Sequence, residues 1–277
     1  MLYLIGTGLY SYENLTLEGL KAIEESKFVY IDYYTSKLGT DIEELELKLN
    51  KKIIIADREL LEQSGEILEN AKNNDVSLLV IGDPIAATTH NSLRIEAIEK
   101  KINVKIIHNA SVFTAVANTG LELYKFGATC SISYPINGVY GKVAYNIIKK
   151  NIKNDLHTLC LMDIKINQID DKDYMDYIKK GVKKYMPDRF MTPSEAIDIL
   201  EIIENQEKKG IINGETKIFV CSRLGCPDEK IISGTLNELK TLKYDKPLFC
   251  MVVVNNNMHF VEEDFYKIFN LENKPKQ

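Results

Sequence analysis

The fold is decided by residues 76–84, which read VSLLVIGDP. The run from Val76 to Ile81 is almost continuously apolar, which is typical of a strand covered on both faces in a parallel sheet flanked by helices. Gly82-Asp83-Pro84 then ends the strand, because proline cannot continue it and glycine permits a sharp turn. Ligands of open α/β sheets bind at the carboxyl ends of strands. This stretch therefore predicts a parallel strand with a binding site at its end.

The same pattern extends through the first 110 residues. Further short apolar runs predict strands at 2–5, 28–33, 53–55 and 104–108. The segments between the strands have helical spacing and predict helices near 16–26, 41–50, 59–73 and 89–101. Strands that alternate with helices indicate an α/β domain with a mostly parallel sheet.

The pattern changes after Ser111. We expect a helix over Val112–Tyr124, strands at 129–134, 158–165, 217–221 and 248–254, and helices near 142–153, 192–208, 234–242 and 261–270. Thr192-Pro193-Ser194-Glu195 marks one helix start, with a capping hydroxyl, a proline at the first position and a glutamate three residues after the cap. The wider strand spacing predicts a second α/β domain with a mixed sheet. We expect domains at 1–113 and 114–277.

Composition narrows the class of protein. The 277 residues are 45% hydrophobic and 27% charged, which is enough apolar surface for a folded chain. A net charge of −5 shows no excess of basic residues for nucleic acid or anionic membranes. No apolar run is long enough to span a bilayer. The five cysteines are scattered and have no metal-site spacing, so we expect free thiols, no metal and a cytoplasmic location.

Four polar loops follow predicted strands. Gly6-Thr7-Gly8 alone is a weak signal, because Ser11 stands where a dinucleotide-binding turn needs its third glycine. The other loops are Gly82-Asp83, 87–91 and 109–113. His90 is expected to be a local hydrogen-bonding partner more than a base, and Ser111 either caps a helix or binds a ligand. Together the loops predict a small-molecule pocket along one edge of the sheet.

Longer motifs carry a family resemblance. The most specific are GDPIAATTH at 82–90 and HTLCLMDIK at 157–165. LYLIGTGL (2–9), DYYTS (32–36), NASV (109–112), TGL (119–121), YKFG (124–127), RLG (223–225) and GTL (234–236) follow the same order. With these motifs, nearly end to end, the chain resembles the diphthine synthase family of the tetrapyrrole-methylase-like fold class. The ADRE run at 56–59 is more similar to the eukaryotic branch.

The resemblance implies two α/β domains, a homodimer, and S-adenosylmethionine bound in the cleft between the domains. It implies that the substrate is elongation factor 2, in which a 3-amino-3-carboxypropyl-histidine is methylated repeatedly, with a methyl ester in eukaryotic members. The implied cofactor positions are Leu9, Asp83, Ala86, Ser111, Val112, Met162, Leu224 and Phe249. Phe249 departs most from the family pattern, which often has histidine there, so a side-chain hydrogen bond does not carry over.

Two alternatives stay open at this point. One is a methyltransferase of the same fold that acts on a tetrapyrrole or precorrin, against which the ATTH and YKFG runs argue. The other is a non-catalytic nucleotide-binding module, although the chain has no G-x4-G-K-[ST] phosphate-binding pattern. We predict no catalytic residue from the sequence. A well-positioned amine can attack a methyl sulfonium without a general acid or a general base, so the reaction does not require one.

Overall fold

The computed structural model describes residues 1–34, 36–166 and 186–271, so Thr35 of the DYYTS motif lies outside the described residues. The described residues form two compact units. The first comprises Met1–Phe113 and the described part of Lys165–Arg189. The second comprises Thr114–Ile164 and the described residues from Phe190 onward.

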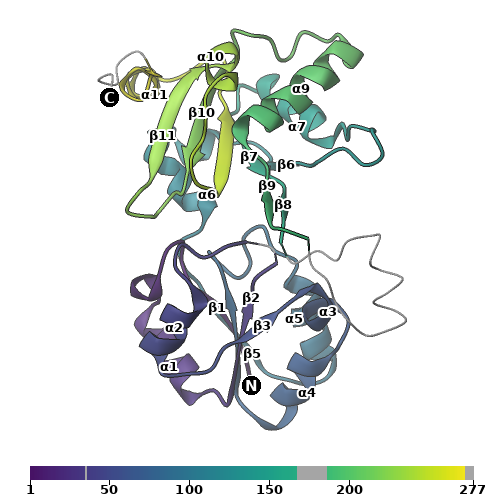
Figure 1. The fold of residues 1–277 in the computed structure, drawn as a ribbon, viewed down its shortest axis with the longest axis vertical. Coiled ribbons are helices and arrows are strands. Elements are labelled where there is room, and N and C mark those ends of the chain that lie inside the picture. The colour runs from purple at the N-terminus through teal and green to yellow at the C-terminus, as the bar shows by residue number, and fades with distance from the viewer. Residues whose placement is uncertain (35, 167–185, 272–277) are drawn as a thin grey trace. The chain divides into compact units, whose positions relative to one another are not determined.

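The first unit is built on a five-stranded sheet (Figure 1). Its strands are β1 (Leu2–Gly6), β2 (Phe28–Asp32), β3 (Ile54–Ala56), β4 (Val76–Val80) and β5 (Val104–Ile107). Their order is β3-β2-β4-β1-β5, and all four pairings are parallel. The predicted parallel sheet is confirmed, and β4 lies in its centre.

Helices cover both faces of this sheet, as the apolar strands predict (Figure 1). They are α1 (Leu17–Glu25), α2 (Ile42–Leu49), α3 (Arg58–Glu62), α4 (Glu66–Asn73) and α5 (Asn91–Glu99), with the 3₁₀ turn η1 (Tyr12–Asn14) before α1. Alternate β1 residues face opposite sides: Leu4 packs in the cluster with α4 and α5, and Ile5 in the cluster with α1 and α2. The single helix expected over 59–73 is wrong: the chain breaks at Gly65, whose φ is +68°.

The second unit is built on a mixed five-stranded sheet. Its strands are β6 (Cys130–Ile132), β7 (Thr158–Met162), β10 (Lys217–Ser222), β11 (Lys230–Thr235) and β12 (Phe249–Val253), in the order β11-β10-β12-β7-β6. Only β6 and β7 pair in parallel, which confirms the predicted mixed sheet. β8 (Ile164–Lys165) and β9 (Arg189–Phe190) form a separate two-stranded sheet. Strand β11 was not predicted, since Ser233 and Gly234 interrupt its apolar run.

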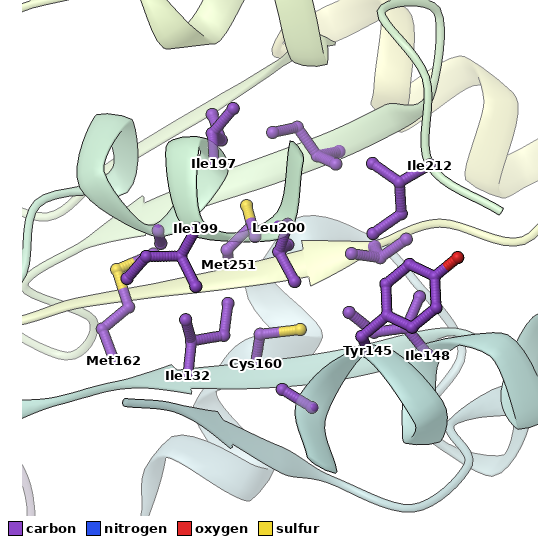
Figure 2. Packing of buried hydrophobic residues seen from close by; sticks show 14 of the residues in the cluster. Ile132, Tyr145, Ile148, Cys160, Met162, Ile197, Ile199, Leu200, Ile212 and Met251 are labelled. Atoms are coloured by element: carbon purple, nitrogen blue, oxygen red, sulfur yellow. The ribbon is translucent and has the colours of Figure 1, made fainter. Parts of the chain in front are cut away.

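Helices also cover both faces of the second sheet. α7 (Val143–Ile152), α9 (Pro193–Glu207) and α10 (Leu236–Lys240) share one apolar cluster, in which Leu200 lies near Met251 and Tyr145 near Ile148 (Figure 2). On the opposite face lies α11 (Phe260–Ile268), whose Tyr266 ring packs edge-on against Phe219. The centroids of the two rings are 5.5 Å apart. Thr192 caps α9 with the reciprocal Glu195 bond that its sequence predicts.

The helix expected over Val112–Tyr124 is wrong. α6 covers only Val112–Ala115 and continues as the 3₁₀ turn η2 (Val116–Thr119). Gly120 then takes a φ of +80°, which ends the turn, and a further 3₁₀ turn, η3, covers Leu123–Lys125. A left-handed residue stops helical hydrogen bonding, and glycine adopts that conformation without strain.

Candidate functional site

The glycine loops after β1 and β4 are bonded to each other. Gly8 N donates to the Gly82 carbonyl oxygen at 3.2 Å, and Gly82 N donates to the Gly8 carbonyl oxygen at 2.8 Å. A β-carbon on Gly6 would lie 2.6 Å from the Gly82 oxygen, closer than packed atoms approach. Because Gly8 and Gly82 both have positive φ, this contact needs glycine on each side. The weak G-x-G signal therefore marks a site of close backbone packing.

Asp83 ties the loop after β4 to the loop after β5. Its Oδ1 accepts a hydrogen bond from Ile85 N at 2.9 Å, and its Oδ2 accepts one from Asn109 N at 3.1 Å. The same Oδ2 lies 2.7 Å from His108 Nδ1. Burial acts to raise the pKa of Asp83, but these hydrogen bonds outweigh it and hold the pKa below its ordinary value. Asp83 is therefore a buried carboxylate that braces two loops.

Asn109 completes the brace. Its Nδ2 donates to the Gly6 carbonyl oxygen at 2.9 Å and to the Asn14 carbonyl oxygen at 2.8 Å. Its Oδ1 accepts from Ala110 N at 2.7 Å. The sequence places His108 at the end of the predicted strand 104–108 and Asn109 in the loop with Ser111, but it predicts no role for either side chain, although both lie where a parallel strand ends. That position was the signal that could have identified them.

Five of the eight expected cofactor positions lie at this edge of the first sheet. Leu9 follows the Gly8–Gly82 bridge and is half-buried. Ser111 is buried and lies close to Gly82, because a β-carbon on Gly82 would be 3.5 Å from the Ser111 Cβ. Ser111 Oγ accepts from Phe113 N at 3.3 Å, the turn geometry expected of a capping hydroxyl. The half-buried Ala86 lies in the loop that Asp83 begins, and Val112 starts α6. The structure brings the loops of Leu9, Asp83 and Ser111 together.

The other three positions lie at one end of the second sheet. Met162 ends β7, Phe249 begins the antiparallel neighbour β12, and Leu224 follows the end of β10. Arg223 N donates to the Leu248 carbonyl oxygen at 2.8 Å, which holds the Leu224 loop beside the start of β12. Phe249 stacks edge-on against Tyr244, 5.9 Å between centroids. These three side chains are apolar, and two of them are buried.

Two of the motifs that carry the family resemblance, HTL and YKFG, have residues that stabilise the fold of the second unit. His157 of the HTL run and Lys125 of the YKFG run both contact Glu262 on α11, at 3.1 and 2.9 Å. His157 Nδ1 accepts from Asn255 N at 3.2 Å, so its Nε2 carries the proton that is donated to Glu262. A β-carbon on Gly127 would lie 2.2 Å from Asn151 Oδ1. These motif residues join the chain segments of the second unit.

Other classes of site are not found in the described parts of the chain. No cluster of three or more histidine, cysteine or acidic side chains there could hold a metal ion. No helix there has the length and apolar character needed to cross a membrane. All five cysteines are buried thiols, and none forms a disulfide.

Comparison with known proteins gives the family. A family model described as tetrapyrrole (corrin/porphyrin) methylases matches residues 1–240. The chain is 40% identical to the diphthine methyl ester synthase of Dictyostelium discoideum, over 98% of this chain and 99% of that protein. It is 39% identical to the diphthine synthase of Methanocaldococcus jannaschii, over 96% and 98%. A crystal structure of a diphthine synthase matches with a TM-score of 0.81 and 32% identity, over 97% and 95% of the two chains. The chain therefore belongs to the diphthine synthase family of tetrapyrrole methylases.

Proposed function

We propose that this chain is an S-adenosylmethionine-dependent methyltransferase of diphthamide biosynthesis. Its substrate is the 3-amino-3-carboxypropyl-histidine of elongation factor 2, which it methylates repeatedly. The observation that carries the proposal is similarity over almost the whole chain to relatives named diphthine synthase or diphthine methyl ester synthase. The loop cluster formed by Gly8, Gly82, Asp83 and Asn109 supports it, because α/β sheets bind ligands at such an edge.

The expected positions fit the chemistry of S-adenosylmethionine. The first unit offers the carboxylate of Asp83, the hydroxyl of Ser111, and backbone groups in glycine turns that allow close approach. The small or apolar side chains at Ala86, Val112, Met162, Leu224 and Phe249 suit the adenine and the methylene groups. The role of Asp83 is cofactor binding, through the loop geometry that its hydrogen bonds fix.

Methyl transfer is an in-line displacement, so the site must supply an unprotonated amine. The nucleophilic nitrogen bonds to the methyl carbon as the carbon–sulfur bond breaks, and S-adenosylhomocysteine leaves. After each of the first two transfers the nitrogen loses a proton to solvent, and the third transfer leaves a quaternary ammonium. A lysine-like amine titrates near pH 10, and desolvation beside the positive sulfonium lowers that value. Positioning of this kind can supply roughly 7–11 kcal/mol of the barrier without a general base.

The number of methyl groups determines the last acceptor. Three transfers turn the amine into a fixed cation, so a fourth methyl goes to a carboxylate oxygen and forms an ester. We propose that this chain makes the ester, because the ADRE run at 56–59 is more similar to the eukaryotic branch of the family. The 39% identity to the archaeal diphthine synthase is nearly the same as the 40% identity to the Dictyostelium ester synthase, so overall identity does not choose between the products. Mass spectrometry of the product before and after mild base decides, because base removes one methyl only if an ester forms.

The family resemblance also supports a homodimer acting in the cytoplasm and two domains, 1–113 and 114–277, although the described part of Lys165–Arg189 groups with the first unit. Light scattering of the purified chain tests the dimer: a particle of about twice the chain mass is expected, and a particle of the chain mass contradicts it.

The main experiment is transfer of radiolabelled methyl groups to elongation factor 2 purified from cells that lack this enzyme. Label is expected on elongation factor 2, and none when its modified histidine is replaced by alanine. Tight S-adenosylmethionine binding without transfer would support the non-catalytic alternative. Label on precorrin-type substrates in a parallel panel would support the tetrapyrrole alternative.

A further inference from the structure

The far end of the 82–90 loop meets the end of β2 through a buried pair of ionisable side chains. Asp32 is the last residue of β2 and is fully buried, and His90 is 3% exposed at the start of α5. Their nearest atoms, His90 Nε2 and Asp32 Oδ2, are 3.3 Å apart. Burial of a carboxylate destabilises the folded protein unless a positive charge or a hydrogen-bond donor lies beside it. His90 is therefore placed where it can offset the burial of Asp32.

Among the described residues, the His90 side chain makes no other polar contact that explains its position. Within the described ranges, neither of its ring nitrogens has a hydrogen bond of good geometry. A histidine that only filled space would leave two polar atoms buried, and a phenylalanine would fill the same space without that penalty. The approach to Asp32 is thus the feature that favours an imidazole here.

A second contact joins the same two segments. The Tyr34 hydroxyl lies 3.4 Å from Thr89 Oγ1 and donates a hydrogen bond to Glu62, and Tyr34 N donates to Asp32 Oδ1 at 3.1 Å. Arg58 Nε in turn contacts Glu62 at 2.9 Å. Residues 89 and 90 are therefore attached together to the segment 32–34 that follows β2.

The loop needs support at this end as well as at its beginning. Gly82 and Asp83 fix the beginning to the neighbouring loops after β1 and β5. Between the ends, Ala87 has a φ of +57°, a left-handed conformation that is unfavourable for alanine. Thr88 Oγ1 donates to the Pro84 carbonyl oxygen at 2.8 Å and closes the loop on itself. Such a conformation persists only where the surroundings impose it.

We propose that His90 and Asp32 are positioning residues for methyl transfer. Together they hold the end of the 82–90 loop so that its middle, Ala86 and Ala87, keeps the shape that receives the cofactor. The inference rests on the proposed function, since it assigns the loop to S-adenosylmethionine binding. It places the support for cofactor binding on the β2 side of the loop, at side chains that do not touch the cofactor themselves.

Three variants test the pair. His90→Phe keeps the ring and removes the polar atoms, His90→Gln keeps a nitrogen that can donate to Asp32, and Asp32→Asn removes the charge. The control is Ser77→Ala, which removes a buried hydroxyl near the start of β4, where Ser77 Oγ lies 2.8 Å from Ser26 Oγ. This control weakens the same unit at the opposite end of β4. Circular dichroism and thermal unfolding establish that each variant is folded.

The measurements are S-adenosylmethionine affinity by calorimetry, kcat and both KM values, and amide hydrogen exchange over 83–91. His90→Phe and Asp32→Asn are expected to bind S-adenosylmethionine roughly ten- to a hundredfold more weakly, because either change removes the buried approach of imidazole to carboxylate that holds the end of the loop. Exchange over 83–91 is expected to become faster. The kcat at saturating cofactor and the KM for elongation factor 2 should stay within about twofold, and His90→Gln should recover most of the affinity.

The results also separate failure of this inference from failure of the proposed function. If the unaltered chain transfers methyl groups and His90→Phe binds S-adenosylmethionine as tightly as Ser77→Ala does, the positioning role is wrong. A fall in kcat with unchanged affinity also overturns it, because His90 would then act in the chemistry. If His90→Phe does not fold, the S-adenosylmethionine affinity of Asp32→Asn, compared with that of Ser77→Ala and His90→Gln, distinguishes the same outcomes. Absence of methyl transfer by the unaltered chain instead contradicts the proposed function, while hydrogen exchange still reports on loop support.

Discussion

At the scale of single residues, Asp83 has three polar contacts at the edge of the first sheet. It is buried, and it accepts hydrogen bonds from two backbone amides while approaching His108. Asp83→Asn keeps the shape but removes the charge, so one of these bonds must be lost or weakened. We predict that S-adenosylmethionine affinity, measured by calorimetry, falls about tenfold, since hydrogen bonds to charged groups contribute about 1.5–3 kcal/mol.

Asp75→Asn is the matched control for this prediction. Asp75 precedes β4 at its opposite end, is 45% exposed, and pairs with the Met1 amino group at 3.1 Å. Its substitution should leave cofactor affinity unchanged. If Asp83→Asn also leaves affinity unchanged but abolishes turnover, the assignment of Asp83 to cofactor binding is wrong and a role in proton removal replaces it.

At the scale of elements, Gly120 determines how η2 ends and how closely α11 packs. A β-carbon there would lie 2.0 Å from the Phe265 ring, and its φ is +80°. Gly120→Ala combines backbone strain of about 1 kcal/mol with a steric clash that typically costs about 1–3 kcal/mol. We predict a loss of roughly 2–4 kcal/mol in the free energy of unfolding, measured by urea denaturation.

Gly138→Ala separates the two causes. Gly138 has nearly the same φ, +77°, but a β-carbon there would meet no atom within 4 Å. This substitution should therefore cost only the strain of about 1 kcal/mol. Equal losses in the two variants would contradict the packing role of Gly120.

Glu262 on α11 makes the second unit sensitive to acid. Burial acts to raise its pKa, but hydrogen bonds from Glu122 N, Lys125, His259 N and His157 outweigh burial and lower the pKa to about 2. The stabilisation by this carboxylate is present above its unfolded pKa near 4.5 and is lost as the pH falls toward 2. We predict a loss of the order of 3 kcal/mol across this window, measured by urea unfolding at several pH values.

Glu262→Gln should flatten this pH dependence and destabilise the chain at pH 7, because it leaves Lys125 beside an uncharged amide. The control is Glu263→Gln, at the exposed neighbouring position. His157 adds a smaller effect of the same sign. Burial lowers the pKa of His157, so its contribution is lost as the pH falls below about 6.5. A Glu262→Gln variant that keeps the full acid dependence would contradict this account.

At the scale of the whole molecule, the eight expected cofactor positions are divided between the two units. If all eight contact S-adenosylmethionine, the cofactor should slow amide exchange in both units, around residues 9, 86 and 111 in the first and around 162, 224 and 249 in the second. The free energy of unfolding should also rise by about 2.7 kcal/mol when the cofactor concentration is a hundredfold above its Kd. Protection limited to the first unit would contradict the assignment of Met162, Leu224 and Phe249.

Much of the architecture was predictable because it depends on local patterns. The apolar run at 76–81 predicted a parallel strand, and the capping box at Thr192 predicted a helix start. The errors occurred where a single residue changed the outcome. Gly65 divides the helix expected over 59–73, and Gly120 ends the turn that was expected to continue to Tyr124. Helical spacing on either side of such a glycine does not reveal whether its φ is positive.

The fold class, the family and the loops that follow the strands can all be inferred from the sequence, since these depend on spacing and order along the chain. Only the tertiary structure decided what the residues in those loops do. It made Asn109 a link between three segments, paired His90 with Asp32, and gathered Lys125 and His157 around Glu262. The partners in these contacts are separated by 58 to 137 positions along the chain. Hydrogen bonds and charge pairing act over a few ångströms in space, so one chain read in order cannot show which distant groups satisfy one another.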